Sequence, residues 1–143
     1  CLEANIAGVP GVALSQSLDS EIFHSWADCR VFPEEAMRVL EERIHRQLGI
    51  TFDALTARSD WLKEPITWNV NMPIDPADDC RLVSSFLGHA YYGSIFKKRD
   101  GHYVHDVDSP IPDEAPTSDT AVVMSGHVSL TRLDLKTFGQ EVE

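Results

Sequence analysis

Apolar and polar residues alternate in the run TWNVNM, residues 67–72, which stops at Pro73. A period of two predicts a half-buried β-strand whose apolar side chains share one face, with Asn69 and Asn71 on the other face. Asparagine is uncommon in strands because its amide bonds to nearby backbone groups. Two explanations stay open for this pair: the asparagines cap the turn around Pro73, or they face a polar cleft beyond the carboxyl end of the strand.

A nearly continuous apolar run over residues 9–14 predicts a second strand, of the kind that is buried on both faces of a parallel sheet. Residues 2–7 have the pattern of a helix end, with Gly8 where the helix stops, and Ser15 marks the carboxyl end of the strand. A helix that leads into a parallel strand belongs to an α/β fold, and a single parallel strand has no fold by itself. We therefore expect the chain to begin inside an α/β unit.

Residues 33–48 have the clearest helical pattern in the sequence, with Pro33 suited to a first helical position and Gly49 to a position just after the end. The apolar residues recur at helical spacing: Met37, Leu40, Ile44 and Leu48. The charged residues are expected to form a solvated surface rather than a binding site: Glu41, Glu42, Arg43 and Arg46. Residues 50–65 predict an irregular connection, and residues 20–31 predict a loop or a short helix.

From residue 81 onward the pattern changes to short strands. Asp100-Gly101 between alternating runs over 91–98 and 102–107 is a strong signal for a β-hairpin, which we expect to protrude. The other elements expected here are a strand before Gly88 that includes Val83, an irregular loop over 109–118, a helical turn over 121–124 and a strand over 128–133.

The length and charge of the chain limit its possible partners. At 143 residues it has the length of one domain, which we divide into the end of an α/β body, residues 1–80, and a segment with the hairpin, residues 81–143. The 12 Lys and Arg residues against 23 Asp and Glu give a net charge of −11, which repels phosphate backbones and anionic lipid. This charge argues against a nucleic-acid polymer as partner, whereas a small nucleotide held through a metal ion is compatible with it.

The three cysteines, Cys1, Cys29 and Cys80, show no spacing typical of a disulfide framework or a zinc site, which fits a reducing cytoplasm. No apolar stretch is long enough to cross a bilayer and no signal-peptide pattern is present, so no membrane partner is expected. Cys1 could be the nucleophile of an autoprocessed hydrolase. Such a nucleophile opens a rigid strand, however, and Cys1 adjoins a predicted helix.

The densest polar group in the sequence comprises His102, His105, Asp106 and Asp108. Histidine and carboxylate can bind a divalent metal, but His102 and His105 point to opposite faces of a strand. A solvated hairpin edge is therefore the favoured interpretation. The sequence contains no Gly-x-Ser-x-Gly elbow and no glycine-rich loop of the P-loop or dinucleotide type.

Four segments resemble, in order, the C-terminal part of the SurE family. They are AGVPGVALS at 7–15, WNVNMP at 68–73, KRDGHY at 98–103, and SDTAV at 118–122 with GHVSLTRL at 126–133. Each motif is weak alone, but four in the same order span nearly the whole chain. The sequence departs from the family pattern at a few positions: Ser118 in place of Thr, Ala121 in place of a bulky or His side chain, His127 in place of Tyr, and Arg132 in place of Pro.

The resemblance implies a SurE-like Rossmann-type fold and a metal-dependent nucleotidase that hydrolyses nucleoside monophosphates to nucleoside and phosphate. It implies a divalent metal, Mg or Mn, in the complete protein, and a homo-oligomer, either a dimer or a tetramer. Ser15, Asn69 and Asn71 would line the substrate cleft. The residues implied in contacts between subunits are Lys98, Arg99, Asp100, Gly101 and Asp119.

The family holds its metal with an Asp-Asp pair after the first strand, a Ser, and an Asn in a glycine-rich loop, and none of these motifs occurs in the sequence. Asp78-Asp79 lies after Pro76 in a turn-like stretch instead. We therefore expect the chain to be a C-terminal portion that lacks the metal site and contains no catalytic residue, and that is inactive alone. The alternative is a catalytically degenerate oligomerisation or interaction module of the same fold.

Overall fold

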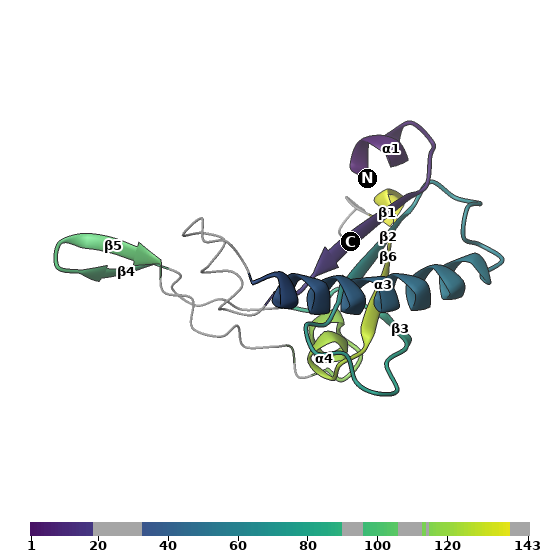
Figure 1. The fold of residues 1–143 in the computed structure, drawn as a ribbon. Coiled ribbons are helices and arrows are strands. Elements are labelled where there is room, and N and C mark those ends of the chain that lie inside the picture. The colour runs from purple at the N-terminus through teal and green to yellow at the C-terminus, as the bar shows by residue number, and fades with distance from the viewer. Residues whose placement is uncertain (19–32, 90–95, 106–112, 114, 138–143) are drawn as a thin grey trace.

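The structure is a computed structural model that describes residues 1–18, 33–89, 96–105, 113 and 115–137. A four-stranded sheet in the order β1-β2-β6-β3 forms the body, and β4 pairs with β5 in a separate two-stranded sheet (Figure 1). The strands are β1 (Gly11–Gln16), β2 (Thr67–Met72), β3 (Leu82–Ser85), β4 (Phe96–Arg99), β5 (His102–His105) and β6 (Val128–Leu133). The helices are α1 (Leu2–Ile6), α3 (Glu34–Thr56) and α4 (Asp119–Met124), followed by the 3₁₀ turn η1 (Leu135–Thr137).

The body sheet is mixed, because its strands run in two directions. β1 and β2 are parallel, β6 is antiparallel to β2, and β3 is parallel to β6. The prediction of an α/β fold is confirmed at this level: a sheet with parallel and antiparallel pairs, and helices packed against it. No helix in the described residues has the length and apolar character needed to cross a bilayer.

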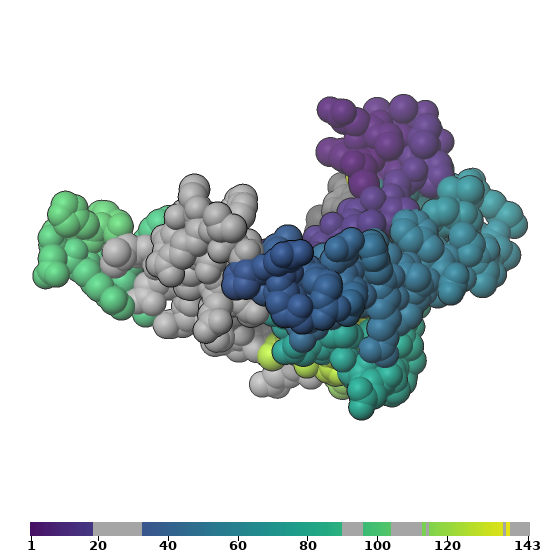
Figure 2. All heavy atoms as spheres, in the orientation of Figure 1, coloured from purple at the N-terminus to yellow at the C-terminus, as the bar shows by residue number. Residues whose placement is uncertain are grey.

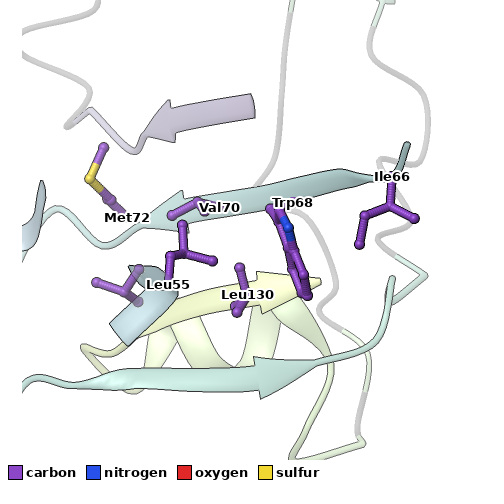
Figure 3. Close-up of a cluster of buried hydrophobic side chains, with 7 residues drawn as sticks. Leu55, Ile66, Trp68, Val70, Met72 and Leu130 are labelled. Carbon is purple, nitrogen blue, oxygen red and sulfur yellow. The ribbon is translucent and has the colours of Figure 1, made fainter. Parts of the chain in front are cut away.

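The strand predicted over 67–72 is confirmed with the same bounds, and it lies inside the sheet between β1 and β6. Its apolar residues Trp68, Val70 and Met72 are at most 3 % exposed. They form the core together with Leu55 of α3 and Leu130 of β6, as Figure 3 shows. Alternation therefore assigned the two faces of this strand correctly, and α3 covers its apolar face.

The helix predicted over 33–48 is confirmed, but its predicted end is wrong, since α3 continues through Gly49 to Thr56. The reason is that buried positions recur at helical spacing past the glycine, at Thr51 and Leu55. Thr51 is polar, but its Oγ1 donates a 2.7 Å hydrogen bond to the carbonyl of Gln47, so burial leaves it satisfied. The packing of Leu55 offsets the cost of about 1 kcal/mol for an interior glycine. The connection predicted as irregular over 50–65 is therefore helical at its start.

The strand predicted over 9–14 exists and is parallel to β2, but it lies two positions later and is not buried on both faces. No residue of β1 is buried, and Leu14 is 44 % exposed. An apolar run indicates that a strand can be buried, but it does not indicate which strands lie beside it. Among the described strands β1 has only β2 beside it, so it lies at the edge of the described sheet.

The short elements near the C-terminal end of the described chain agree with the predictions. The helical turn over 121–124 is part of α4, and β6 has the predicted bounds. Ser118 caps α4, because its Oγ accepts the N–H of Ala121 at 3.1 Å. Val122 of α4 is buried outside the core cluster of the α3 side, and α4 lies behind β6 in Figure 3. The sheet therefore has a helix on each face.

The predicted hairpin is confirmed. β4 and β5 are antiparallel, and Asp100 and Gly101 between them have φ of 48° and 81°, the left-handed pair that a two-residue hairpin turn requires. Figure 1 shows the hairpin standing away from the body sheet, and in Figure 2 it forms one end of the molecule. The prediction for residues 20–31 and most of the predicted loop over 109–118 lie outside the described residues.

Candidate functional site

The polar face of the body sheet brings Ser15, Asn71 and Ser129 into one row across three neighbouring strands. Ser15 of β1 is the register partner of Asn71 in β2, and Asn71 is the register partner of Ser129 in β6. Register partners point to the same face of a sheet, so the three side chains are neighbours. The row lies near the carboxyl ends of the parallel strands β1 and β2, where ligands collect in α/β folds.

A second row lies one pair of residues further back on the same face. Asn69 of β2 is opposite Thr131 of β6, and Thr131 is opposite Ser85 of β3. The hydroxyls of Ser85 and Thr131 share a 2.8 Å hydrogen bond. Within the described residues, the amide of Asn69 makes no hydrogen bond of its own. This leaves its donors and its acceptor available on the face that also carries the hydroxyls of Ser129, Thr131 and Ser85.

The two explanations for the asparagines are now distinguishable at Asn71. Its Nδ2 donates to Ser129 Oγ at 3.3 Å, which is a contact across the sheet and not with the turn that follows Pro73. The side chain of Asn71 therefore contacts the neighbouring strand β6 rather than the turn. One N–H of its amide and its carbonyl oxygen remain for another partner.

The polar face is closed at one side and open at the other. Ser129 and Thr131 are buried beneath α4, the asparagines are half-buried, and Ser15 at the sheet edge is exposed. Farther back along β2, Thr67 Oγ1 donates to Oδ1 of Asn5 in α1, so that end of the face is covered by α1. Access from solvent is therefore at the carboxyl ends of β1 and β2.

A second polar group, which the sequence did not indicate, joins these strand ends on the α3 side. Gln16 Nε2 donates to the carbonyls of Ser17 and Pro73 at 3.0 Å, and Gln47 Nε2 donates to Gln16 Oε1 at 3.4 Å. Gln47 is fully buried, and within the described residues its Oε1 accepts no hydrogen bond. These amides fix the geometry of the strand ends from below the candidate site.

The turn after β2 is held by two arginines from the charged face of α3. Arg43 donates to the carbonyl of Ile74 at 3.2 Å, and Arg46 donates to the carbonyl of Asp78 at 2.9 Å. The prediction of a merely solvated charged face is thus incomplete, because both side chains anchor backbone while they stay partly exposed. Glu41 and Glu42 of the same face are exposed as predicted.

The residues implied in subunit contacts fall in two separate places. Lys98, Arg99, Asp100 and Gly101 lie at the exposed tip of the hairpin, whereas Asp119 is half-buried at the start of α4. Asp119 Oδ1 accepts the N–H of Gly88 at 3.0 Å and the N–H of Thr120 at 2.8 Å. Its contacts therefore join α4 to the chain after β3. Neither place belongs to the polar face.

Titratable groups do not gather at this site within the described residues. No three of the His, Cys, Asp and Glu side chains in that part of the chain lie close enough together to hold a metal ion. Burial raises the pKa of the Cys80 thiol, so this cysteine stays protonated and is a poor nucleophile. A groove of about 240 Å³ lies on α3, away from the polar face, and is lined by Met37, Leu40, Glu41, Ile44 and His45.

The sequence identified Ser15, Asn69 and Asn71, and the register places them on one face. It missed their neighbours Ser129, Thr131 and Ser85. The alternation in VSLTRL, residues 128–133, carried the necessary signal, because it places Ser129 and Thr131 on the same face of their strand. The alternation could not reveal that this strand pairs with β2.

The chain matches no protein-family model, and no curated protein matches it. The sheet topology defines the chain only as an α/β domain with a mixed sheet and an attached hairpin. A more specific assignment rests on the residues themselves.

Proposed function

We propose that this chain forms the substrate-binding wall of a phosphomonoesterase that hydrolyses nucleoside monophosphates, as the C-terminal part of a SurE-like Rossmann-type fold. The observation that carries the proposal is the register of β1 and β2, which sets Ser15 beside Asn71 on an open polar face. The two most distinctive segments of the family resemblance, at 7–15 and 68–73, are thus neighbours in space. They meet at the carboxyl ends of parallel strands, where such sites form.

The side chains of the polar face are suited to binding the uncharged groups of a nucleoside monophosphate. Ser15 offers a hydroxyl, and Asn69 and Asn71 offer amide N–H donors and carbonyl acceptors to an ester oxygen or a sugar hydroxyl. All three are uncharged, so they position a substrate without balancing the charge of its phosphate. Residues of fixed orientation contribute to rate by holding the substrate in a reactive geometry.

The expected Mg or Mn ion is not accommodated by these residues. Both metals prefer several oxygen ligands that include carboxylates, whereas the polar face offers only hydroxyl and amide oxygens. We therefore assign the metal ligands to polypeptide beyond the described residues and derive no catalytic step through the metal. The 143 residues alone are expected to release no phosphate from nucleoside monophosphates.

The test measures phosphate release by the complete gene product with each nucleoside monophosphate in Mg or Mn buffer. Replacement of Asn71 by alanine should lower kcat/KM about 10- to 100-fold, because it removes hydrogen bonds of about 1–3 kcal/mol. The matched control is Ser84→Ala, which changes an exposed serine on the opposite face of β3. Equal activity of wild type and Asn71→Ala, or release of phosphate by the 143 residues alone, would contradict the proposal.

A second candidate, an oligomerisation module of the same fold without catalysis, is favoured by the hairpin. Phe96 and Tyr103 of its two strands are 53 % and 73 % exposed, which is unusual for aromatic side chains on a short two-stranded sheet. If this candidate is right, Tyr103→Ala weakens self-association, and the complete gene product with metal shows no phosphatase activity. Activity in that assay would remove this candidate.

A further inference from the structure

Ser129 is a fully buried serine whose hydroxyl accepts a hydrogen bond from the side-chain amide of Asn71. The bond is 3.3 Å long and joins register partners in β6 and β2, the two inner strands of the body sheet. The neighbouring side-chain pair on the same face, Thr131 and Ser85, joins two hydroxyls and involves no asparagine. The hydroxyl of Ser129 therefore holds the amide of Asn71 in one orientation.

This orientation determines which atom Asn71 presents to the open end of the polar face. A side-chain amide is planar, and its nitrogen and its oxygen lie on two diverging branches. Because Nδ2 is directed to Ser129 in β6, Oδ1 is directed away from β6, to the side of β2 on which β1 lies. Ser15, the register partner of Asn71 in β1, adds a hydroxyl there that makes no hydrogen bond within the described residues.

The carbonyl oxygen of Asn71 and the hydroxyl oxygen of Ser15 are two neighbouring acceptors. Register partners on adjacent strands are about 4.8 Å apart, so the two side chains suit a pair of adjacent donors. The phosphate of a nucleotide carries ionised oxygens, which are themselves acceptors and do not pair with a carbonyl oxygen. The ribose carries adjacent hydroxyls at C2′ and C3′, and each of them is a donor. The sugar, rather than the phosphate, therefore matches these two side chains.

We propose that Asn71 Oδ1 and Ser15 Oγ bind the 2′- and 3′-hydroxyls of a ribonucleoside 5′-monophosphate, and that Ser129 is the positioning residue that orients Asn71 for this contact. The inference rests on the proposed function and narrows its substrates to ribonucleotides with both hydroxyls free. A 2′-deoxyribose lacks one of the two donors, so it leaves one acceptor of the site unpaired. Ser129 acts through Asn71 and does not contact the substrate.

The first experiment compares kcat/KM of the complete gene product, in Mg or Mn buffer, for adenosine 5′-monophosphate and for its 2′-deoxy analogue. We expect the wild type to prefer the ribonucleotide about tenfold, the effect of one hydrogen bond. The ratio compares two substrates on the same molecules, so a partly unfolded variant still reports it. A ratio within about twofold of one, in a protein that hydrolyses both nucleotides, overturns this inference and leaves the proposed function intact. Hydrolysis of neither nucleotide overturns the proposed function, and this inference with it.

The second experiment tests the role of Ser129 by a double-mutant cycle in the same ratio. Ser129→Ala should bring the ratio toward one, because the amide of Asn71 can then turn its NH₂ group to the substrate. Asn71→Ala should also bring the ratio toward one, and Ser129→Ala should change nothing further in the Asn71→Ala background.

The matched control is Thr67→Val, which should keep the wild-type ratio. Like Ser129, Thr67 is a buried residue whose hydroxyl bonds to the side chain of an asparagine, but its partner Asn5 lies at the closed end of the face. A wild-type ratio in Ser129→Ala, or a further fall when Ser129→Ala is combined with Asn71→Ala, overturns the positioning role.

Discussion

β1 and β2 are parallel neighbours of equal length, yet one is an edge strand and the other lies inside the sheet. β2 has a partner on each side and a helix over its apolar face, and its apolar residues are almost completely buried. β1 has one described partner, and no residue of it is buried. The more apolar run of the two is thus the more exposed, so position in the sheet, rather than composition, decides how much a strand contributes to stability.

In the proposed function the two strands have different roles. The interior strand supplies Asn69 and Asn71, whose orientation is fixed by pairing on both sides, while the edge strand supplies Ser15, which solvent reaches. An interior strand thus positions a ligand precisely, and an edge strand leaves an entrance.

The largest expected effect is the difference between β2 and β1 in their contribution to the free energy of unfolding. Trp68→Ala should lower the free energy of unfolding by about 3–5 kcal/mol, because it removes a fully packed ring. That ring also lies 4.8 Å from the guanidinium of Arg58 and donates to the carbonyl of Trp61 at 3.1 Å. Val12→Ala in β1 should cost about 1 kcal/mol, since Val12 is only half-buried. Urea unfolding of both variants measures the difference, and equal costs would remove the distinction between the strands.

A smaller effect is expected at the turns. Gly126, just before β6, has φ of +82°, and a Cβ there would lie 2.8 Å from the backbone N of Ala77. Gly126→Ala should therefore cost about 2–3 kcal/mol. Gly101 of the hairpin has φ of +81° with open space around it, so Gly101→Ala should cost about 1 kcal/mol. Thermal unfolding of the two variants compares a turn packed against the body with an exposed turn. A larger loss of stability in Gly101→Ala than in Gly126→Ala would contradict the account.

A stabilising change is expected at the ends of the two strands. Gln47→Met removes the buried Oε1 that accepts no hydrogen bond within the described residues, and it keeps the length of the side chain. The change loses two hydrogen bonds of Nε2, one to the carbonyl of Arg43 at 3.2 Å and a long one to Gln16 at 3.4 Å, so the net gain is expected to be at most about 1 kcal/mol. Chemical denaturation measures it. A loss above 1 kcal/mol would show that the amide connects α3 to β1 more strongly than its geometry indicates.

The smallest effect is a pH dependence near β2. Hydrogen bonds from the Arg58 guanidinium lower the pKa of Asp60 below its ordinary value of 3.8. The unfolded state therefore binds this proton at higher pH than the folded state, so the stabilisation is complete above pH 3.8 and is lost as pH falls through the folded pKa. Asp60→Asn should flatten stability between about pH 4 and pH 2, because it removes this stabilisation at all higher pH, including pH 7, and changes little at the acid end. An acid limb as steep as that of the wild type would exclude this contribution.

Elements with a strong local signal were predictable from the sequence. The alternation of β2, the Asp100-Gly101 turn and the alternation of β6 each determine their element through neighbouring residues only. The end of α3 was missed because Gly49 indicated a stop and because Thr51, past this glycine, is a polar residue that the fold buries with a hydrogen bond. A hydropathy pattern counts such residues as exposed.

The candidate site was predictable in part for the same reason. Ser15, Asn69 and Asn71 stand out in their own strands, so the sequence finds them one by one. Their meeting with Ser129 and Ser85 depends on the order and direction of strands far apart in the chain, which no local pattern contains. The position of β1 at the edge of the described sheet likewise depends on strand order, and an apolar run cannot reveal it.

The most direct test of the account places a bound substrate against the polar face. Mn²⁺ is paramagnetic, so when it binds with a nucleoside monophosphate to the complete gene product it broadens the NMR signals of nearby groups. We predict stronger broadening of the side-chain NH₂ signals of Asn69 and Asn71 than of the NH₂ signal of Asn5, which lies beside Thr67 at the other end of β2. Sharp signals from both asparagines in a protein that hydrolyses the nucleotide would place the substrate elsewhere and contradict the proposed function.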